Sequence, residues 1–298
     1  MKPLRNPPLV FLVAMVLWAT HASPAPLPIG HSKRDLVIND TSLTIYCFKP
    51  ERYRNGALLV SFHGLSRDIP RYLEASKPIA ERNGLLLVLP VFDRARFPYW
   101  RYQGLGITRQ NRRVTSGPIP VEPPATWTSV LVNGIVDEIR RVELKPTLDY
   151  YLIGHSAGGQ IANRLAAFAS MAAKRIVVSN PSSYVVPSRD ARFPYGFGAL
   201  PPSIANNETL RRYLAQPMTI FAGQEDVLDE NLDMRAAAMA QGATRYDRAR
   251  NVFRLAKAIA NERGWTFNWT LVEVPGVGHD VTRMYGSPQV DFALFGQH

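Results

Sequence analysis

The residues Gly154-His155-Ser156-Ala157-Gly158 place a serine between small neighbours. The apolar run 150–153 precedes this pentapeptide, and an amphipathic segment follows it at once. A nucleophilic serine on a sharp turn between a strand and a helix needs such neighbours, because its backbone is strained and passes close to both elements. The pentapeptide also fits an ordinary turn. The choice depends on whether the chain supplies a base, an acid and oxyanion donors.

A serine hydroxyl is a weak nucleophile at neutral pH and needs a base within hydrogen-bond reach. Elimination among the six histidines selects one of them. His279 lies in the glycine-rich stretch "VPGVGHDV" after the last predicted strand, where it can fold over the sheet edge. The other five are less suitable. His21 lies in the N-terminal apolar segment, His31 precedes the predicted fold and His63 ends an early strand. His155 is next to the serine and His298 is the last residue.

An imidazole base needs an acid that fixes its tautomer and stabilises the imidazolium. The segment 218–233, "MTIFAGQEDVLDENLD", supplies several acids just after a predicted strand. Asp226 follows the turn at Gly223 by three residues and is our predicted partner of His279. Glu225 and Asp229 are the alternatives.

Acyl transfer also needs hydrogen-bond donors for the oxyanion of the tetrahedral intermediate. The backbone N–H of Ala157, directly after the serine, is one predicted donor. The other is the N–H of Leu65, because Gly64 lets the backbone turn inward after the strand "VSFH". We expect His63 to brace this loop rather than to take part in the chemistry.

Short apolar runs alternate with helical patterns along the chain, which indicates an α/β fold with crossover helices. Several runs are almost continuously apolar and are typical of parallel strands covered on both faces. Four helices are expected at 71–84, 126–142, 158–173 and 245–264, and the first two strands form an edge hairpin through Asn39-Asp40. A loop or short lid is expected over 180–207. The predicted strands are 35–38, 43–48, 57–63, 85–91, 150–153, 175–179, 218–222 and 268–274.

The order Ser156, Asp226, His279, with His63-Gly64 upstream, resembles the α/β-hydrolase superfamily over nearly all of the chain. The resemblance implies an eight-stranded, mostly parallel sheet with helices on both faces and the nucleophile after the fifth strand. The sequences "HSAGGQ" and "YQGLG" are similar to those of secreted esterases of the polyhydroxybutyrate-depolymerase and feruloyl-esterase type. The chain lacks the cysteine pairs often found there, and an insoluble polymer is therefore the less expected substrate.

The stretch "ARFPY" occurs twice, at 95–99 and 191–195. Both copies follow strands whose loops leave the carboxyl edge of the sheet, the edge that carries Ser156. We therefore expect aromatic walls around an acyl or aryl group, with Arg96 or Arg192 available to a substrate carboxylate. Coincidental repetition, with each loop packed into its own surroundings, is the alternative. The predicted pocket residues are Phe97, Tyr99, Trp100, Phe193 and Tyr195.

The N-terminal residues have the layout of a secretory signal peptide: Lys2 and Arg5, an apolar run too short to span a bilayer, then small residues. We expect cleavage after Ala22, export to the periplasm or medium, and one domain over 23–298. No cysteine follows the run, so a stable membrane anchor is not expected. The only cysteine, Cys47, is predicted to be a buried thiol on the apolar side of a strand.

The net charge is +11, but the arginines are scattered and no nucleic-acid motif occurs. We interpret this charge as a generally basic surface and expect no nucleic-acid partner. The sequence thus predicts an exported serine hydrolase of carboxylic esters, acting on a small or oligomeric ester without a cofactor or metal. A serine peptidase or amidase and a non-catalytic binding protein are the alternatives, and the oligomeric state stays open.

Overall fold

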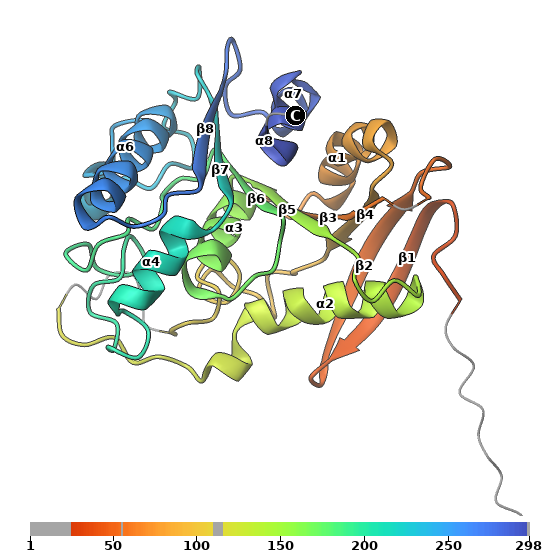
Figure 1. Ribbon diagram of the computed structural model, residues 1–298, viewed down its shortest axis with the longest axis horizontal. Helices are drawn as coiled ribbons and strands as arrows, with labels where there is room; N and C mark the ends of the chain where they lie inside the picture. The colour runs from red at the N-terminus through yellow and green to blue at the C-terminus, as the bar shows by residue number, and fades with distance from the viewer. Residues whose placement is uncertain (1–24, 55, 110–115, 297–298) are drawn as a thin grey trace, which may run out of the picture.

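The computed structural model describes residues 25–54, 56–109 and 116–296. The predicted signal peptide lies outside the described residues. An open eight-stranded sheet has the order β1-β2-β4-β3-β5-β6-β7-β8, in which β1 and β2 are antiparallel and β4, β3, β5, β6, β7 and β8 run parallel (Figure 1). The strands are β1 (Gly30–Ile38), β2 (Thr41–Lys49), β3 (Leu58–Phe62), β4 (Leu86–Pro90), β5 (Tyr150–His155), β6 (Arg175–Ser179), β7 (Met218–Gly223) and β8 (Trp269–Val274).

The central strands form where the sequence is continuously apolar. Every residue of β3 and β4 is buried, as expected for parallel strands with helices on both faces. The edge hairpin is confirmed, with Asn39 and Asp40 at positive φ in its turn. β1 begins at Gly30, five residues earlier than predicted, because its exposed face carries polar side chains that hide the strand pattern.

Two residues of this hairpin, His31 and Cys47, were placed by the sequence, one wrongly and one correctly. His31 does not precede the fold but lies in β1, where its ring packs 4.9 Å from that of Phe48. Cys47 is 1% exposed, and burial raises the pKa of its thiol to about 12, which makes it a poor nucleophile.

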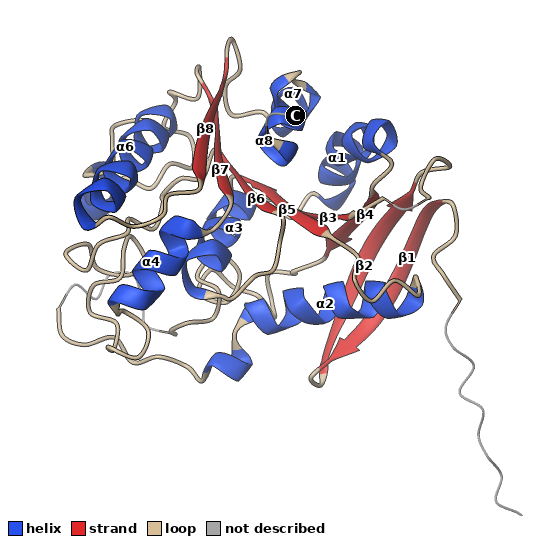
Figure 2. Ribbon diagram, in the orientation of Figure 1, coloured by secondary structure: helices blue, strands red, loops and turns tan. Residues whose placement is uncertain are grey.

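Helices cover both faces of the sheet (Figure 2). One face is covered by α1 (Ile69–Asn83), α7 (Val281–Gly286) and α8 (Gln289–Phe295). The other is covered by α2 (Thr128–Val142), α3 (Ala157–Phe168), α4 (Asn207–Ala215) and α6 (Arg245–Arg263). Two short helices, η1 (Pro124–Thr126) and α5 (Ala236–Met239), lie in connections.

The helix ends agree with local chemistry. Thr244 and Asp247 form a capping box at the start of α6, and Gly264 adopts the left-handed conformation that ends it. Gly84 ends α1 in the same way. No described helix is long and apolar enough to cross a membrane.

The segment 180–207, where we expected a short lid, packs largely into the body of the protein. Tyr184, Val185 and Phe197 are fully buried, and Gln241 exchanges two hydrogen bonds with the backbone of Tyr184. Of this segment, only Ser182 lines the cleft beside Ser156. The residues that face the cleft from beyond β7 come instead from Asn231–Arg235.

Candidate active site

Ser156 sits between β5 and α3 with φ 59° and ψ −118°, a conformation that L-residues rarely adopt. The glycines beside it are required by close approach of the backbone. A Cβ on Gly154 would lie 2.1 Å from the carbonyl oxygen of Gly158, and one on Gly158 would lie 2.2 Å from that of Phe62. The turn therefore holds the serine side chain above the carboxyl edge of the sheet.

The structure brings Ser156, His279 and Asp226 together in one hydrogen-bonded chain. Ser156 Oγ lies 3.1 Å from His279 Nε2, and His279 Nδ1 lies 2.7 Å from Asp226 Oδ2. The three residues follow β5, β8 and β7, whose carboxyl ends meet at the same edge. Glu225 and Asp229, the alternative acids, have exposed side chains. Such a chain can activate a hydroxyl for attack on a carbonyl.

Arg245, which the sequence analysis did not single out, holds the second oxygen of the Asp226 carboxylate at 3.3 Å. Both side chains are 1% exposed. Burial lowers the pKa of Arg245, and the charge of Asp226 partly offsets that effect. Arg245 also donates to the carbonyls of Leu228 and Glu230, so it ties the segment after β7 to the start of α6. No sequence pattern signals this pair, because its members are 19 residues apart.

His155 points away from the cleft, as expected for the residue before the serine. Its Nδ1 lies 3.1 Å from the hydroxyl of Ser179, and its ring centroid lies 4.7 Å from that of His279. Burial, reinforced by the neighbouring His279, holds the pKa of His155 well below its usual range. His155 is therefore a neutral packing partner beneath the His279 ring.

The predicted oxyanion donors lie on two elements. Ala157 is the first residue of α3, so its N–H has no acceptor within the helix and lies at the positive end of the helix dipole. Leu65 follows β3 and lines the same cleft as Ser156 and Ala157. A Cβ on Gly64 would lie 2.3 Å from the hydroxyl of the buried Tyr72, so a larger residue here would displace that side chain.

Side chains hold three consecutive carbonyls of the loop that carries Leu65. Tyr102 donates its hydroxyl to the carbonyl of His63 at 2.6 Å. Arg67 donates to that of Gly64 at 3.4 Å, and Arg94 donates to that of Leu65 at 3.0 Å. Because a trans peptide directs its N–H away from its C=O, these contacts fix where the loop's N–H groups point.

His63 braces the same loop. Its Nε2 accepts a hydrogen bond from the backbone N–H of Phe92, and its Nδ1 then donates to the carbonyl of Gly64, both at 3.1 Å. Burial, followed by the charge of Arg67, lowers the pKa of His63 to about 3. These partners require the neutral ring.

Ser156 opens into a cleft of about 790 Å³ that also contains Leu65 and Ala157. Two glutamines contribute to its floor: Gln103 donates to Gln160 at 3.2 Å, and Gln160 donates to Ser183 at 3.1 Å. Gln103 lies in "YQGLG" and Gln160 lies in "HSAGGQ", two sequences that carry the family resemblance but predicted no role for either glutamine. The remaining lining residues are Arg67, Arg94, Pro98, Tyr99, Ser182, Asn231, Leu232, Asp233, Met234 and Arg235.

The five aromatic residues predicted to wall this cleft separate in the structure. Only Tyr99 lines it. Phe97 is fully buried and packs edge-on against Phe92, and Phe193 packs against Phe168. Tyr195 is buried and donates its hydroxyl to Asp233, a lining residue, at 2.8 Å, so it supports the wall from behind.

Trp100 also lies outside the lining of this cleft, and Arg109 lies over its ring. The arginines proposed to meet a carboxylate point elsewhere as well. Arg96 pairs with Asp93 and donates to the carbonyl of Ser42, while Arg192 donates to those of Gly117 and Ser116. The guanidinium groups at the cleft belong to other residues.

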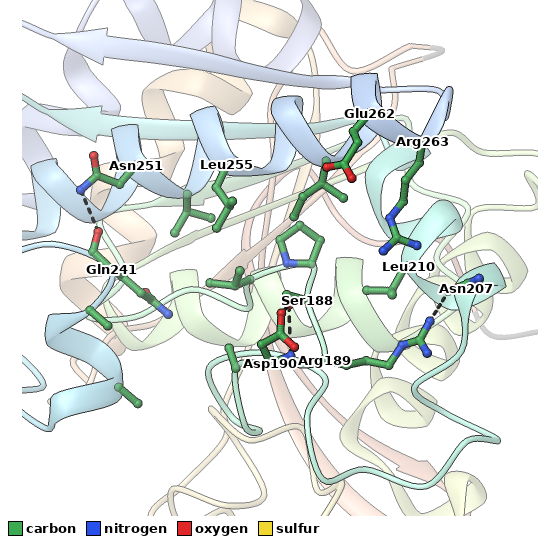
Figure 3. Close-up of a pocket in the computed structure, with 17 residues that line it drawn as sticks. Ser188, Arg189, Asp190, Asn207, Leu210, Gln241, Asn251, Leu255, Glu262 and Arg263 are labelled. Carbon is green, nitrogen blue, oxygen red and sulfur yellow. Dashed lines mark hydrogen bonds between the residues drawn. The ribbon is translucent and has the colours of Figure 1, made fainter.

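A second cavity, of about 860 Å³, lies between α6 and the segment 186–191 and includes no residue of the Ser156 chain (Figure 3). Its walls combine apolar and polar side chains, with Arg189, Glu262 and Arg263 at one end. In the described ranges, no group of three or more His, Cys, Asp or Glu side chains is arranged to hold a metal ion. Ser156 lines the smaller cleft and not this cavity.

Comparison with solved structures gives three informative matches. The chain is similar to poly(3-hydroxybutyrate) depolymerase LpqC from Bordetella parapertussis, with 31% identity over 87% of each chain and a TM-score of 0.77. Poly(aspartic acid) hydrolase-1 from Sphingomonas sp. KT-1 has 24% identity, with 87% of this chain and 96% of that one covered, and a TM-score of 0.78. Siderophore hydrolase EstB from Aspergillus nidulans has 14% identity over 91% and 96% of the two chains, with a TM-score of 0.51. No family model and no curated protein sequence matches the chain.

Proposed function

Because the chain belongs to the α/β-hydrolase superfamily, in the group of poly(3-hydroxybutyrate) depolymerase and related esterases, we propose that it is a serine hydrolase that cleaves carboxylic esters. The observation that carries this proposal is the hydrogen-bonded chain from Ser156 through His279 to Asp226, with contacts of 3.1 and 2.7 Å. It joins a nucleophile, a base and an orienting acid within reach of one another.

In the proposed mechanism, Ser156 Oγ attacks the ester carbonyl while His279 Nε2 takes its proton. Asp226 holds the His279 tautomer and stabilises the imidazolium. The backbone N–H groups of Leu65 and Ala157 bind the oxyanion. His279 then returns the proton to the leaving alcohol, and a water molecule releases the acid from the acyl-enzyme by the same steps.

Hydrolysis of a 4-nitrophenyl ester series from acetyl to palmitoyl, with Ser156→Ala beside the wild type, tests this function. We expect turnover by the wild type with a clear preference in acyl length, and a loss of at least about 10³-fold in kcat for the variant, because the nucleophile is gone. A serine-directed fluorophosphonate should add its mass to the wild type alone.

Two outcomes would redirect the assignment. Faster cleavage of an amide analogue than of the matching ester would favour an amidase or peptidase. A folded wild type that neither hydrolyses an ester or amide nor reacts with the fluorophosphonate would favour the non-catalytic binding protein. The activity named for the 31% identical relative makes oligomers of 3-hydroxybutyrate the first natural substrates to assay.

The proposal also includes export. Its support is the sequence layout of residues 1–22, with basic residues, an apolar run and small residues in order. Expression of the full chain should yield a periplasmic or secreted protein whose first residue is Ser23. A cytoplasmic protein that retains Met1 or begins at Lys2 would contradict it.

A further inference from the structure

The cleft beside Ser156 has an excess of positive charge. Three guanidinium groups line it, those of Arg67, Arg94 and Arg235, against the single carboxylate of Asp233. Asp229 and Glu230 lie nearby in sequence, but they are exposed and do not line the cleft. A narrow site lined by one sign of charge concentrates ligands of the opposite sign.

Two of the three arginines are already engaged. Arg235 pairs with Asp233, with its Nε 2.7 Å from one carboxylate oxygen and its Nη2 on the other. Arg67 donates to the carbonyls of Gly64 and Phe97, and its guanidinium lies 4.2 Å from the centre of the Tyr102 ring. Each of these two guanidinium groups donates two hydrogen bonds within the protein and adds its charge to the cleft.

Arg94 differs from both. Its side chain is exposed, and among the described residues no carboxylate pairs with it. The acid next to it in sequence, Asp93, is taken by Arg96 at 2.7 Å. A single hydrogen bond of 3.0 Å to the Leu65 carbonyl ties the Arg94 guanidinium to the loop of the proposed oxyanion donor. The Arg94 guanidinium therefore lines the same cleft as Ser156, and this one hydrogen bond leaves it further N–H donors for a ligand.

We propose that Arg94 binds a carboxylate of the substrate, so that the preferred substrates are esters that carry a free carboxylate a few bonds from the scissile carbonyl. The carboxyl-terminated end of a hydroxyacid oligomer has this chemistry. A planar guanidinium can meet a carboxylate through two parallel hydrogen bonds, which gives orientation as well as charge attraction. This inference rests on the proposed function and narrows its substrate class.

Two matched substrate pairs test the inference. In the first, 4-nitrophenyl hydrogen adipate is compared with the 4-nitrophenyl ester of adipic acid monoamide, in which an amide replaces the carboxylate on the acyl side. In the second, the linear dimer of 3-hydroxybutyrate is compared with its terminal amide, which varies the alcohol side. The measured quantity is the ratio of kcat/KM for the acid to kcat/KM for the amide.

We expect a ratio of about ten or more in at least one pair for the wild type, from a charge-assisted hydrogen bond to the carboxylate. Arg94→Gln should bring that ratio close to one, and Arg94→Lys should retain part of it. Because the ratio compares two substrates on one variant, any loss that Arg94→Gln causes through Leu65 cancels. Arg211→Gln, which removes the same charge from an exposed position on α4 that does not line the cleft, is the control and should leave the ratio unchanged.

Three results would overturn the inference. The wild type could hydrolyse both amides as fast as the acids. Alternatively, Arg211→Gln could lower the ratio as much as Arg94→Gln does, which would assign the preference to the overall charge. Failure of a folded wild type to cleave any of the four esters would contradict the proposed function itself, and the inference would fall with it.

Discussion

Both ring nitrogens of His279 have partners, Ser156 at Nε2 and Asp226 at Nδ1. Asp226 is in turn held between His279 and Arg245, and its side chain is almost fully buried. Because both oxygens of the Asp226 carboxylate have partners, the group has little freedom to move and fixes the orientation of the His279 imidazole. A buried guanidinium beside it also offsets a charge that would otherwise be costly to bury.

Asp226→Asn should lower kcat for a 4-nitrophenyl ester by about 10³- to 10⁴-fold, because an amide in this position supports the wrong tautomer of the imidazole. Steady-state kinetics with a fixed short-chain ester measure the effect. Glu225→Gln and Asp229→Asn, which change exposed acids of the same segment, are the controls and should stay within about threefold of the wild type. If kcat falls as far in either control as in Asp226→Asn, the assignment of Asp226 as the acid is wrong.

At the residue scale, a site residue could be predicted from the sequence when it lies in a short local motif or when few residues of its type occur in the chain. A pentapeptide marked Ser156, and six histidines allowed elimination to His279. The surroundings of Arg94 and Arg245 could not be predicted from the sequence, because their partners lie on other segments of the fold. The aromatic residues show the same limit: "ARFPY" tells that Phe97 lies in a loop, but not that its ring turns inward onto Phe92.

Among the elements, the junction of β5 and α3 is tightly constrained on both sides of Ser156. Gly154 lets β5 approach the start of α3, and Gly158 lets α3 approach β3, more closely than a residue with a Cβ allows. The strain at Ser156 is held by this packing and by the hydrogen bond from its N–H to the carbonyl of Ser179 on β6.

Gly158→Ala should therefore destabilise the protein by at least about 2 kcal/mol, although alanine favours a helix, since its Cβ would meet backbone atoms of Phe62 that cannot move independently of β3. Gly286→Ala, at the end of α7, is the matched control, because no atom lies within 4 Å of its added Cβ. Urea unfolding midpoints measure both. Equal stability of Gly158→Ala and the wild type would refute the close approach.

The elements themselves were largely predictable. Continuous apolar runs located β3 and β4 within one or two residues, and the Asn83-Gly84 stop ended α1 where expected. The segments after β6 and β7 were not, because they lack periodicity and their course depends on side-chain contacts such as that between Tyr195 and Asp233. This is why the expected lid over 180–207 proved largely buried, while Asn231–Arg235 reached the cleft.

At the scale of the whole molecule, two histidines of the described ranges are buried in the neutral state. His63 and His155 both lie near the carboxyl edge of the sheet, and burial lowers the pKa of each. The unfolded chain takes up a proton on each ring near pH 6.5, whereas the folded chain resists protonation until far lower pH. Their contribution to stability is therefore complete above pH 6.5 and declines as the pH falls toward about 3.

His63→Gln should reduce this dependence. A histidine that stays neutral when folded lowers the free energy of unfolding by about 1.4 kcal/mol per pH unit below its unfolded pKa. Between pH 7 and pH 5, the wild type should lose about 2 kcal/mol more than His63→Gln does, as measured by urea titration at each pH. Identical losses in the two proteins would show that His63 takes up a proton in the folded state.

The hydrogen bonds that fix the loop 63–65 link substrate range to turnover, two properties that are usually engineered separately. Tyr102 and Arg94 secure carbonyls of this loop, and both belong to the connection after β4 that also supplies Tyr99 and Gln103 to the cleft. A graft of this connection from a relative would replace the walls and, with them, the anchors of the proposed oxyanion loop. Substrate range and turnover would then be inherited together, and a successful exchange must carry the anchors along with the walls.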